Sequence, residues 1–398
     1  MNLLHFKDNA SNRDVISLFS GAMGLDIGIL KAGLHIVIGQ DFDPVCAATM
    51  RINGHKVLDG DIREINEEDL LEQTGLAQGE PFLICGGPPC QPFSTAGKRL
   101  GINDPRGSLF MDFIRMIDYI RPRFFIMENV KGIMSAPLKH TPLAKRDKSG
   151  SEQYSGTALD IVLSEFDKLG YKTVYGILDA INYGVPQFRE RFVLIGSRDN
   201  EDIFLPFPTH FQMHQDSQYR WRTLNDTIRD LEYNCGECAA FSEDRLAYLR
   251  LVPEGGNWRD LPESMRKEAM GGAYGSGGGK VGFYRRLSYS QPSPTLVTSP
   301  VQKATMMCHP TQDRPLSIRE YARIQQFPDD WQFVGTSAAK YRQIGNAVPV
   351  GLALALGKAI LSVADQSAEI HTKRFRGTDI HQKLKRAIEI GGSCYAHK

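Results

Sequence analysis

Several features of secreted, membrane-spanning and disulfide-rich proteins are missing from this sequence. It contains no run of about 18 apolar residues, so we expect no membrane span. Residues 1–13 are polar and lack the apolar stretch of a signal peptide. The seven cysteines are an odd number without a regular pattern, which argues against a disulfide framework. These absences predict a protein of a reducing compartment, the cytoplasm.

An excess of charge of either sign is also absent, because 47 basic and 46 acidic residues leave a net charge of +1. Overall charge therefore neither indicates nor excludes a nucleic-acid partner, and local clusters matter more. Basic residues gather at 139–148, at Arg285 and Arg286, and at 373–386. Short charged runs are by default solvated surface, so these clusters alone assign no partner.

The pattern of apolar residues divides the 398-residue chain into parts of different kinds. Before Ser197, short apolar runs alternate with amphipathic stretches, which predicts a largely parallel sheet covered by helices on both faces. Strands are expected at 14–19, 35–39, 82–85, 123–127, 173–178 and 192–196. Helices are expected at 24–32, 44–53, 109–120, 157–169, 317–326 and 350–364. We predict an α/β domain over 1–200, a smaller irregular domain over 201–310, and a segment over 311–398 that returns to the first domain.

Residues 86–94, GGPPCQPFS, form the most specific motif. Two glycines and two prolines stop a buried strand and fix the backbone just before Cys90. A lone free cysteine is more often a small core residue. The flanking prolines, Gln91 and Ser94 favour a thiol that is placed for chemistry.

A second group of residues lies where three consecutive strands are expected to end. The turn 18–24, LFSGAMG, has glycines that let a ligand approach the backbone at a helix start. Asp41 and Phe42 end the second strand, where an acid often holds a ribose and an aromatic ring can stack on a purine. Asp61 follows Val57 and Leu58, which stand where the next strand is expected to end. These residues indicate a nucleoside pocket, or else Asp41 and Asp61 are helix caps or turn residues.

Three more positions carry side chains suited to chemistry. Glu128 ends the strand 123–127, so it should emerge at the same sheet edge as Cys90, unless it simply faces solvent. A carboxyl in a water-poor cleft can stay protonated and act as an acid. Strand alternation places Arg189 and Arg191 on one face, opposite Glu190, where they suit a phosphate or a base edge.

Two further motifs indicate a function less specifically than those above. The segment 343–349, QIGNAVP, is expected to start a helix, with Asn346 as a cap or as a ligand contact. Cys235 and Cys238 have metal-ligand spacing, but no second pair accompanies them, so no metal is expected.

Together these motifs resemble those of the DNA (cytosine-5) methyltransferase family of bacterial restriction–modification systems. The matching segments, in the family's order, are 19–24, 87–94, 128–130, 187–191 and 345–349. The segment 286–300 is similar to the one that supports the family's recognition domain. The resemblance covers roughly 15–196 and 286–361. One departure is Met23, where the family often has glycine, and it is expected to tighten the cofactor loop.

The resemblance implies a Rossmann-like, S-adenosylmethionine-dependent methyltransferase domain with a mostly parallel sheet, and a smaller target-recognition domain. Asp41 would then hold the ribose, Phe42 the adenine ring and Asp61 the adenine amine. The residues expected to bind S-adenosyl-L-methionine are Phe19, Ser20, Gly21, Ala22, Gly24, Asp41, Phe42, Asp61, Ile62, Pro88, Leu109, Asn346 and Ala347.

The resemblance also implies a mechanism on a cytosine flipped out of duplex DNA. The Cys90 thiolate would add at C6, Glu128 would act at N3, and Arg191 would hold the exocyclic oxygen. Arg189 would steady the loop or a phosphate. The base that removes the C5 proton is not assigned, and water is one candidate. The expected DNA contacts are Gln91, Ser94, Lys98, Arg99, Arg286 and Thr295.

The expected partner is double-stranded DNA, bound by a monomer, with a cognate restriction endonuclease in the same system that need not bind. One alternative is an RNA (tRNA) cytosine-5 methyltransferase on the same scaffold. Another is a non-catalytic DNA-binding protein that has kept the fold. The long segment 201–310 favours DNA, because reading a duplex sequence needs extra surface. The intact Cys90, Glu128, Arg189 and Arg191 argue against a binding-only protein.

Overall fold

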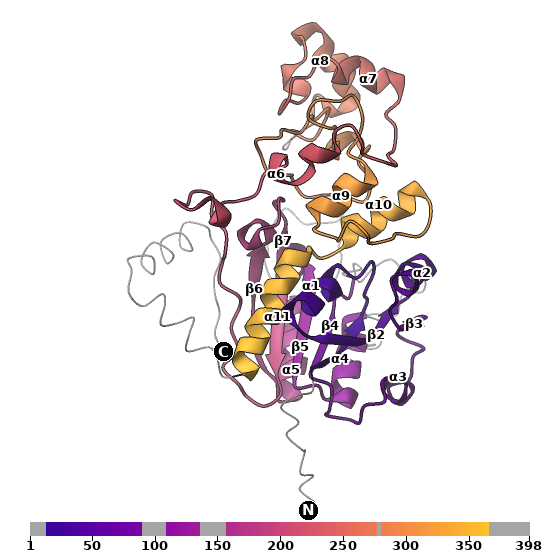
Figure 1. Cartoon of the computed structure of the whole chain (residues 1–398), viewed down its shortest axis with the longest axis vertical. Coiled ribbons are helices and arrows are strands. Elements are labelled where there is room, and N and C mark those ends of the chain that lie inside the picture. The colour runs from indigo at the N-terminus through magenta and orange to yellow at the C-terminus, as the bar shows by residue number, and fades with distance from the viewer. Residues whose placement is uncertain (1–12, 90–108, 136–156, 277–279, 366–398) are drawn as a thin grey trace, which may run out of the picture.

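A seven-stranded sheet forms the larger lobe of the protein, and a smaller, mostly helical lobe lies above it (Figure 1). The computed structural model describes residues 13–89, 109–135, 157–276 and 280–365. The strand order is β3-β2-β1-β4-β5-β7-β6. The strands are β1 (Asp14–Leu18), β2 (His35–Asp41), β3 (Val57–Asp59), β4 (Leu83–Gly86), β5 (Phe124–Val130), β6 (Lys172–Asp179) and β7 (Glu190–Ser197).

The direction of β7 decides which side chains meet at the edge of the sheet. Strands β1 to β5 pair in parallel, whereas β7 runs antiparallel to both β5 and β6. In this register Arg191, near the start of β7, lies opposite Val130, at the end of β5. The predicted mostly parallel sheet is confirmed. The reversed β7 brings Arg191 to the carboxyl edge, beside Glu128.

Helices cover both faces of the sheet. One face carries α1 (Gly24–Ala32), α2 (Pro44–Ile52) and α11 (Val350–Ala364), and the other carries α3 (Glu67–Thr74), α4 (Leu109–Ile120) and α5 (Thr157–Lys168). Helices α1, α4 and α11 have the predicted bounds. Helix α3 was not predicted, because Leu70 and Leu71 are its only buried side chains in a mostly charged sequence.

The C-terminal helix α11 packs directly on α1, although the two are more than 300 residues apart in the sequence (Figure 1). A Cβ atom on Gly28 would lie 2.3 Å from the Cβ of Ala353, and one on Gly357 would lie 2.7 Å from that of Ala32. Glycine at both positions therefore allows the close crossing. The segment Ser337–Ala364 is apolar enough to cross a membrane, but 61% of its most apolar window is buried in the protein, as in a core helix.

The upper lobe has a small core of its own and a base that shares the core of the sheet. Its helices are α6 (Asn225–Ile228), α7 (Glu243–Leu249), α8 (Glu263–Met270), α9 (Ile318–Ile324) and α10 (Ser337–Asn346). Leu249, Leu261 and Met306 belong to the separate core. By contrast, Tyr321 of α9 and Ile344 of α10 pack in the cluster that also contains α1 and α11.

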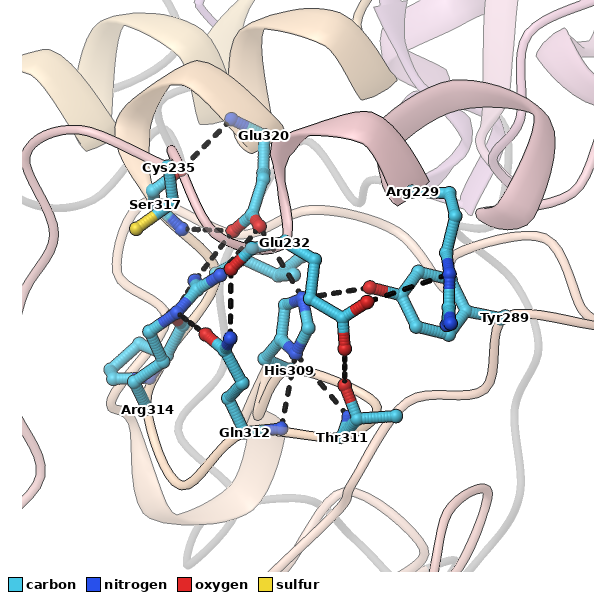
Figure 2. A network of polar contacts seen from close by, with 12 residues as sticks. Arg229, Glu232, Cys235, Tyr289, His309, Thr311, Gln312, Arg314, Ser317 and Glu320 are labelled. Carbon is cyan, nitrogen blue, oxygen red and sulfur yellow. Dashed lines mark hydrogen bonds and ion pairs between the residues drawn. The ribbon is translucent and has the colours of Figure 1, made fainter.

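A buried polar network inside the upper lobe links His309 to the start of α9 (Figure 2). Nδ1 of His309 accepts hydrogen bonds from the backbone amides of Thr311 and Gln312 at 3.3 and 3.1 Å. Its Nε2 lies 3.1 Å from the Tyr289 hydroxyl and 3.5 Å from Oε1 of Glu320. Burial lowers the pKa of His309 to about 3, so the imidazole is neutral, and its bonds hold residues 309–312 to Tyr289 and to the start of α9.

Candidate active site

A cavity of about 970 Å³ lies at the carboxyl edge of the sheet, beneath the upper lobe. Its walls come from the ends of β1, β2, β4 and β5, from the turn after α10, and from residues 295–298. Every residue predicted to bind the cofactor lines it: Phe19, Ser20, Gly21, Ala22, Gly24, Asp41, Phe42, Asp61, Ile62, Pro88, Leu109, Asn346 and Ala347.

The turn between β1 and α1 is held in an unusual backbone conformation. Phe19, Gly21 and Met23 have φ values of 55°, 55° and 67°, in the left-handed region that favours glycine. The amide of Met23 donates to the carbonyl of Ser20 at 2.8 Å, and the Met23 side chain is fully buried. Core packing of this side chain therefore offsets the strain at a position where glycine would be relaxed.

Asp41 is bonded to two turns and also lines the cavity. Its Oδ2 accepts a hydrogen bond from the amide of Gly21 at 2.7 Å, and its Oδ1 accepts one from the amide of Asp43 at 2.8 Å. The carboxyl thus ties the turn after β1 to the turn after β2 while it lines the cavity. Burial raises the pKa of Asp41, and the two amides oppose that shift.

The other two predicted nucleoside contacts lie nearer to solvent. The ring of Phe42 is 70% exposed at the rim of the cavity and is free to receive a flat ligand. Asp61 forms an ion pair with Arg63, whose guanidinium lowers the pKa of this carboxyl. Phe42 is thus exposed at the cavity, whereas Arg63 occupies the carboxyl of Asp61.

Asp26 of α1 is a buried carboxyl that the sequence did not single out. It is fully buried, and neither oxygen has a hydrogen-bond partner among the residues described. Burial raises its pKa to about 7, and the nearby Ser17 hydroxyl offsets only part of the shift. Asp26 is also a lining residue of the cavity.

The turn after α10 forms the opposite part of the cavity wall. Asn346 is exposed there, but it is the last residue of α10, whereas the next helix is preceded by Pro349 as its N-cap. The prediction that Asn346 caps a starting helix is therefore wrong. A Cβ atom on Gly345 would lie 2.5 Å from the carbonyl oxygen of Val297, so glycine allows the turn to contact the upper lobe.

Glu128 and Arg191 form a buried ion pair on the far side of the cavity. Nε of Arg191 lies 2.7 Å from Oε1 of Glu128, and both side chains are only 11% exposed. Burial raises the pKa of Glu128, and the positive charges of Arg191 and Arg189 only partly oppose it. A Cβ atom on Gly87 would lie 3.0 Å from Oε2 of Glu128, so this glycine lets the carboxyl approach the chain that leads to Cys90.

Arg189 faces inward, as alternation predicted, but it bonds to the protein itself. It is 1% exposed, and its guanidinium donates to the carbonyls of Leu296, Gly345 and Ala347 at 2.9, 2.7 and 3.1 Å. Burial lowers its pKa to about 9. Glu190 points away and pairs with Lys131, as expected. Arg189 therefore holds loops together and does not reach a phosphate at the surface.

Asn129 is a site residue that the sequence analysis missed. Its Nδ2 donates to the carbonyl oxygen of Pro88 at 2.7 Å, and the side chain is buried. This bond anchors the end of β5 to the backbone two residues before Cys90. The position of Asn129 directly after Glu128 in the sequence could have marked it as a site residue. Cys90 itself, with Gln91, Ser94, Lys98 and Arg99, lies outside the described residues.

The two remaining predicted DNA contacts differ in their placement. Thr295 is exposed at the cavity, and its hydroxyl donates to the carbonyl of Phe188 at 2.7 Å. Arg286 is 5% exposed and donates to the carbonyls of Leu249 and Val252 at 2.8 and 2.9 Å. Arg286 also pairs with Asp313. These bonds occupy its guanidinium inside the upper lobe, so the expectation of a DNA contact at Arg286 is corrected to a structural role.

Cys235 is drawn with the network of Figure 2, and neither Cys235 nor Cys238 lines the cavity. Both are free thiols. In the part of the chain that the structure describes, no group of three or more His, Cys, Asp or Glu side chains could hold a metal ion.

Comparison with known proteins places this geometry in a family. A family model described as C-5 cytosine-specific DNA methylase matches residues 13–362. Type II methyltransferase M.PspPI of Psychrobacter sp. (strain TA137) is 40% identical over 359 residues, which cover 87% of this chain and 78% of that protein. Type II methyltransferase M.Sau96I of Staphylococcus aureus is 40% identical over 361 residues, which cover 89% and 77%.

A solved structure supports the fold independently. A chain described as a prophage-encoded DNA modification methyltransferase of E. coli superposes with a TM-score of 0.59 at 23% identity. The superposition covers 88% of this chain and 99% of that one. At this identity the likeness supports the α/β architecture alone.

Proposed function

The chain belongs to the C-5 cytosine-specific DNA methylase family, and we propose that it acts through a covalent adduct between Cys90 and the target cytosine. As a member of this family it transfers a methyl group from S-adenosylmethionine to C5 of cytosine in DNA. The observation that carries the proposed mechanism is the buried Glu128–Arg191 pair beside Gly87, at the start of the segment that contains Cys90.

Two groups of residues in the cavity serve the two substrates, one the cofactor and the other the cytosine. We call Asp41, Phe42 and Asp61 the cofactor wall, and Glu128, Arg189 and Arg191 the catalytic wall. The cofactor wall supplies two carboxyls for hydroxyl and amine groups and an exposed ring for stacking, which suits an adenosine. S-adenosylmethionine, when bound there, supplies an electrophilic methyl group.

The catalytic wall serves the pyrimidine ring. The Cys90 thiolate forms a bond to C6, and the electron pair displaced from the C5–C6 double bond makes C5 nucleophilic. Glu128, whose pKa is raised by burial, holds the proton that N3 needs during this addition. Arg191 orients Glu128 and offers its guanidinium to the exocyclic oxygen. After C5 has gained the methyl group, a base removes the C5 proton, the C5–C6 double bond forms again as the bond from sulfur to C6 breaks, the thiolate is restored, and N3 returns its proton to Glu128.

The duplex must present its cytosine outside the base stack, because a stacked ring cannot reach the cavity. We assign target reading to the upper lobe within residues 201–310, and catalysis and cofactor binding to residues 1–200. Within residues 311–398, the packing of α11 on α1 supports a return to the catalytic domain, whereas α9 and α10 lie in the upper lobe. The protein acts as a monomer on double-stranded DNA, in a restriction–modification system with its own endonuclease.

One experiment separates this proposal from RNA methylation and from binding without catalysis. The protein and its Cys90→Ala variant are incubated with labelled S-adenosylmethionine and either duplex DNA or tRNA. We expect label in DNA with the wild type only, together with a denaturation-resistant protein–DNA adduct on DNA that carries 5-fluorocytosine at the target. Label in tRNA but not in DNA contradicts the substrate, and equal transfer by Cys90→Ala contradicts the covalent mechanism.

A further inference from the structure

A pair of glutamines connects two neighbouring segments of the chain that line the cavity. Gln325, at the end of α9, and Gln187, just before β7, are both fully buried. Nε2 of Gln187 donates to Oε1 of Gln325 at 3.0 Å. We name this contact the glutamine bridge. A buried amide pair of this kind has a defined direction, because each group must meet a donor or an acceptor.

One end of the glutamine bridge holds the turn that lines the cavity. Nε2 of Gln325 donates to the carbonyls of Ile344 and Ala347 at 2.7 and 3.1 Å. Its backbone carbonyl accepts from the amide of Val350 at 3.1 Å, at the start of α11. Gln325 therefore fixes the residues on both sides of Asn346 without contacting the cavity itself.

The other end holds the segment that enters the cavity from the upper lobe. Oε1 of Gln187 accepts from the amide of Leu296 at 2.8 Å. The neighbouring Arg189 donates to the Leu296 carbonyl and, with its other amino group, to the turn at Gly345. Both backbone groups of Leu296 are thus bound, next to the exposed Thr295.

We propose that Gln325 and Gln187 are positioning residues for the two substrates, with Gln325 setting the cofactor side and Gln187 setting the DNA side. This rests on the proposed function for the assignment of Asn346, Ala347 and Thr295 to their ligands. Removing either glutamine leaves the reacting groups in place but loosens a different segment beside the cavity. Loss of Gln325 releases the turn at Ala347, whereas loss of Gln187 releases Leu296.

The test uses methionine, which keeps the length of glutamine but has neither its amide donor nor its acceptor. For Gln325→Met we expect KM and the dissociation constant for S-adenosylmethionine to rise about tenfold, as the loss of buried hydrogen bonds implies. The KM for DNA and kcat should stay within about threefold. For Gln187→Met we expect the KM for DNA to rise more than the KM for S-adenosylmethionine.

Gln326→Met is the matched control. Gln326 follows Gln325 directly, and its Nε2 donates to the carbonyl of Gly184 at 2.8 Å, away from the cavity. The Gln326→Met variant should have a lower Tm, but its KM values for S-adenosylmethionine and for DNA should not change. The proposal is overturned if Gln325→Met leaves cofactor affinity unchanged, if Gln326→Met weakens it equally, or if both bridge variants affect the same substrate.

Should Gln325→Met fail to fold, Gln325→Glu tests the same point, because it keeps the size and loses the donated bonds. It should weaken cofactor binding, and unchanged binding contradicts the proposal. Calorimetric titration with S-adenosylmethionine in the absence of DNA reads cofactor binding without methyl transfer. Failure of the covalent mechanism, seen with Cys90→Ala, is therefore distinguishable from failure of the bridge.

Discussion

The cofactor wall and the catalytic wall hold their acidic groups in different ways. On the cofactor wall Asp41 accepts bonds from the amides of Gly21 and Asp43, and behind it Asp26 has no hydrogen-bond partner among the described residues. On the catalytic wall Glu128 is paired with Arg191 at 2.7 Å. Burial raises the pKa in all three carboxyls, but arginine opposes the rise only at Glu128.

The difference shows how one cavity can hold carboxyls for separate purposes. Backbone amides fix Asp41 in place while leaving it capacity to accept a ligand's donors. A guanidinium next to Glu128 keeps the carboxyl oriented although it is out of water. Each wall can therefore be disturbed alone, and the expected effects differ in size and in kind.

Glu128→Gln should break the catalytic wall alone and have the largest effect. We expect turnover to fall about 10²- to 10⁴-fold, because the acid that serves N3 is lost. The affinity for S-adenosylmethionine should stay within about twofold, because Glu128 is not on the cofactor wall. Single-turnover transfer of labelled methyl groups and calorimetry measure the two quantities. Glu190→Gln on the opposite face is the control, and a matched loss of rate and affinity would contradict the role.

Asp26→Asn should remove a buried carboxyl that lowers the stability of the protein as the pH rises. The folded-state pKa of Asp26 is raised from 3.8 to about 7, so its contribution to stability is present below pH 4 and is lost as the pH rises through 7. Relative to wild type, the free energy of unfolding of the variant should rise by about 3 kcal/mol between pH 5 and pH 8. Urea unfolding at both pH values checks this, and parallel stability profiles would refute it.

Asp41→Ala should weaken the cofactor wall and leave the chemistry intact. The carboxyl also binds the amides of Gly21 and Asp43, so its loss loosens the turn after β1. We expect affinity for S-adenosylmethionine to fall about 10- to 100-fold, the range for bonds to a charged group. Turnover at saturating cofactor should change little. Unchanged affinity in a calorimetric titration would remove Asp41 from the site.

Phe42→Ala should have the smallest effect, because it removes only a stacking surface. Its ring is 70% exposed, and an aromatic pair contributes about 0.5–1.5 kcal/mol, or roughly 2- to 10-fold in affinity. Phe207→Ala, an exposed ring that does not line the cavity, is the control. Equal cofactor affinities for the two variants would show that Phe42 does not stack on the ligand.

Much of the α/β lobe could be predicted because its signals are local. Helices α1, α4 and α11 have the predicted bounds, since apolar spacing and flanking turn residues mark them in the sequence. Helix α10 was missed because its mean composition is polar, and Asn346 was therefore assigned to a helix start. The direction of β7 was not predictable, because apolar alternation does not encode which way a strand runs.

The arginine residues also show how far the sequence alone can predict contacts in the site. Sequence alternation placed Arg189 and Arg191 on one face, and both do face inward. Nothing local shows that Arg189 binds carbonyls from residues more than 100 positions away. Arg286 lies in a basic dipeptide typical of a DNA contact, yet carbonyls of the upper lobe surround it. A charged residue's partners depend on which distant segments reach it.

The sequence by itself carried motifs that resemble those of one family, which implied the cofactor and the reaction, and it placed the predicted cofactor-binding residues at the sheet edge where they line the cavity. It could do so because strand ends, glycine turns and the Cys90 motif are short-range patterns tied to chemistry. Only the tertiary structure decided that Glu128 pairs with Arg191, that Asp26 lacks a hydrogen-bond partner among the described residues, and that Gln187 meets Gln325. These facts depend on burial and on contacts between distant segments, which no local pattern records.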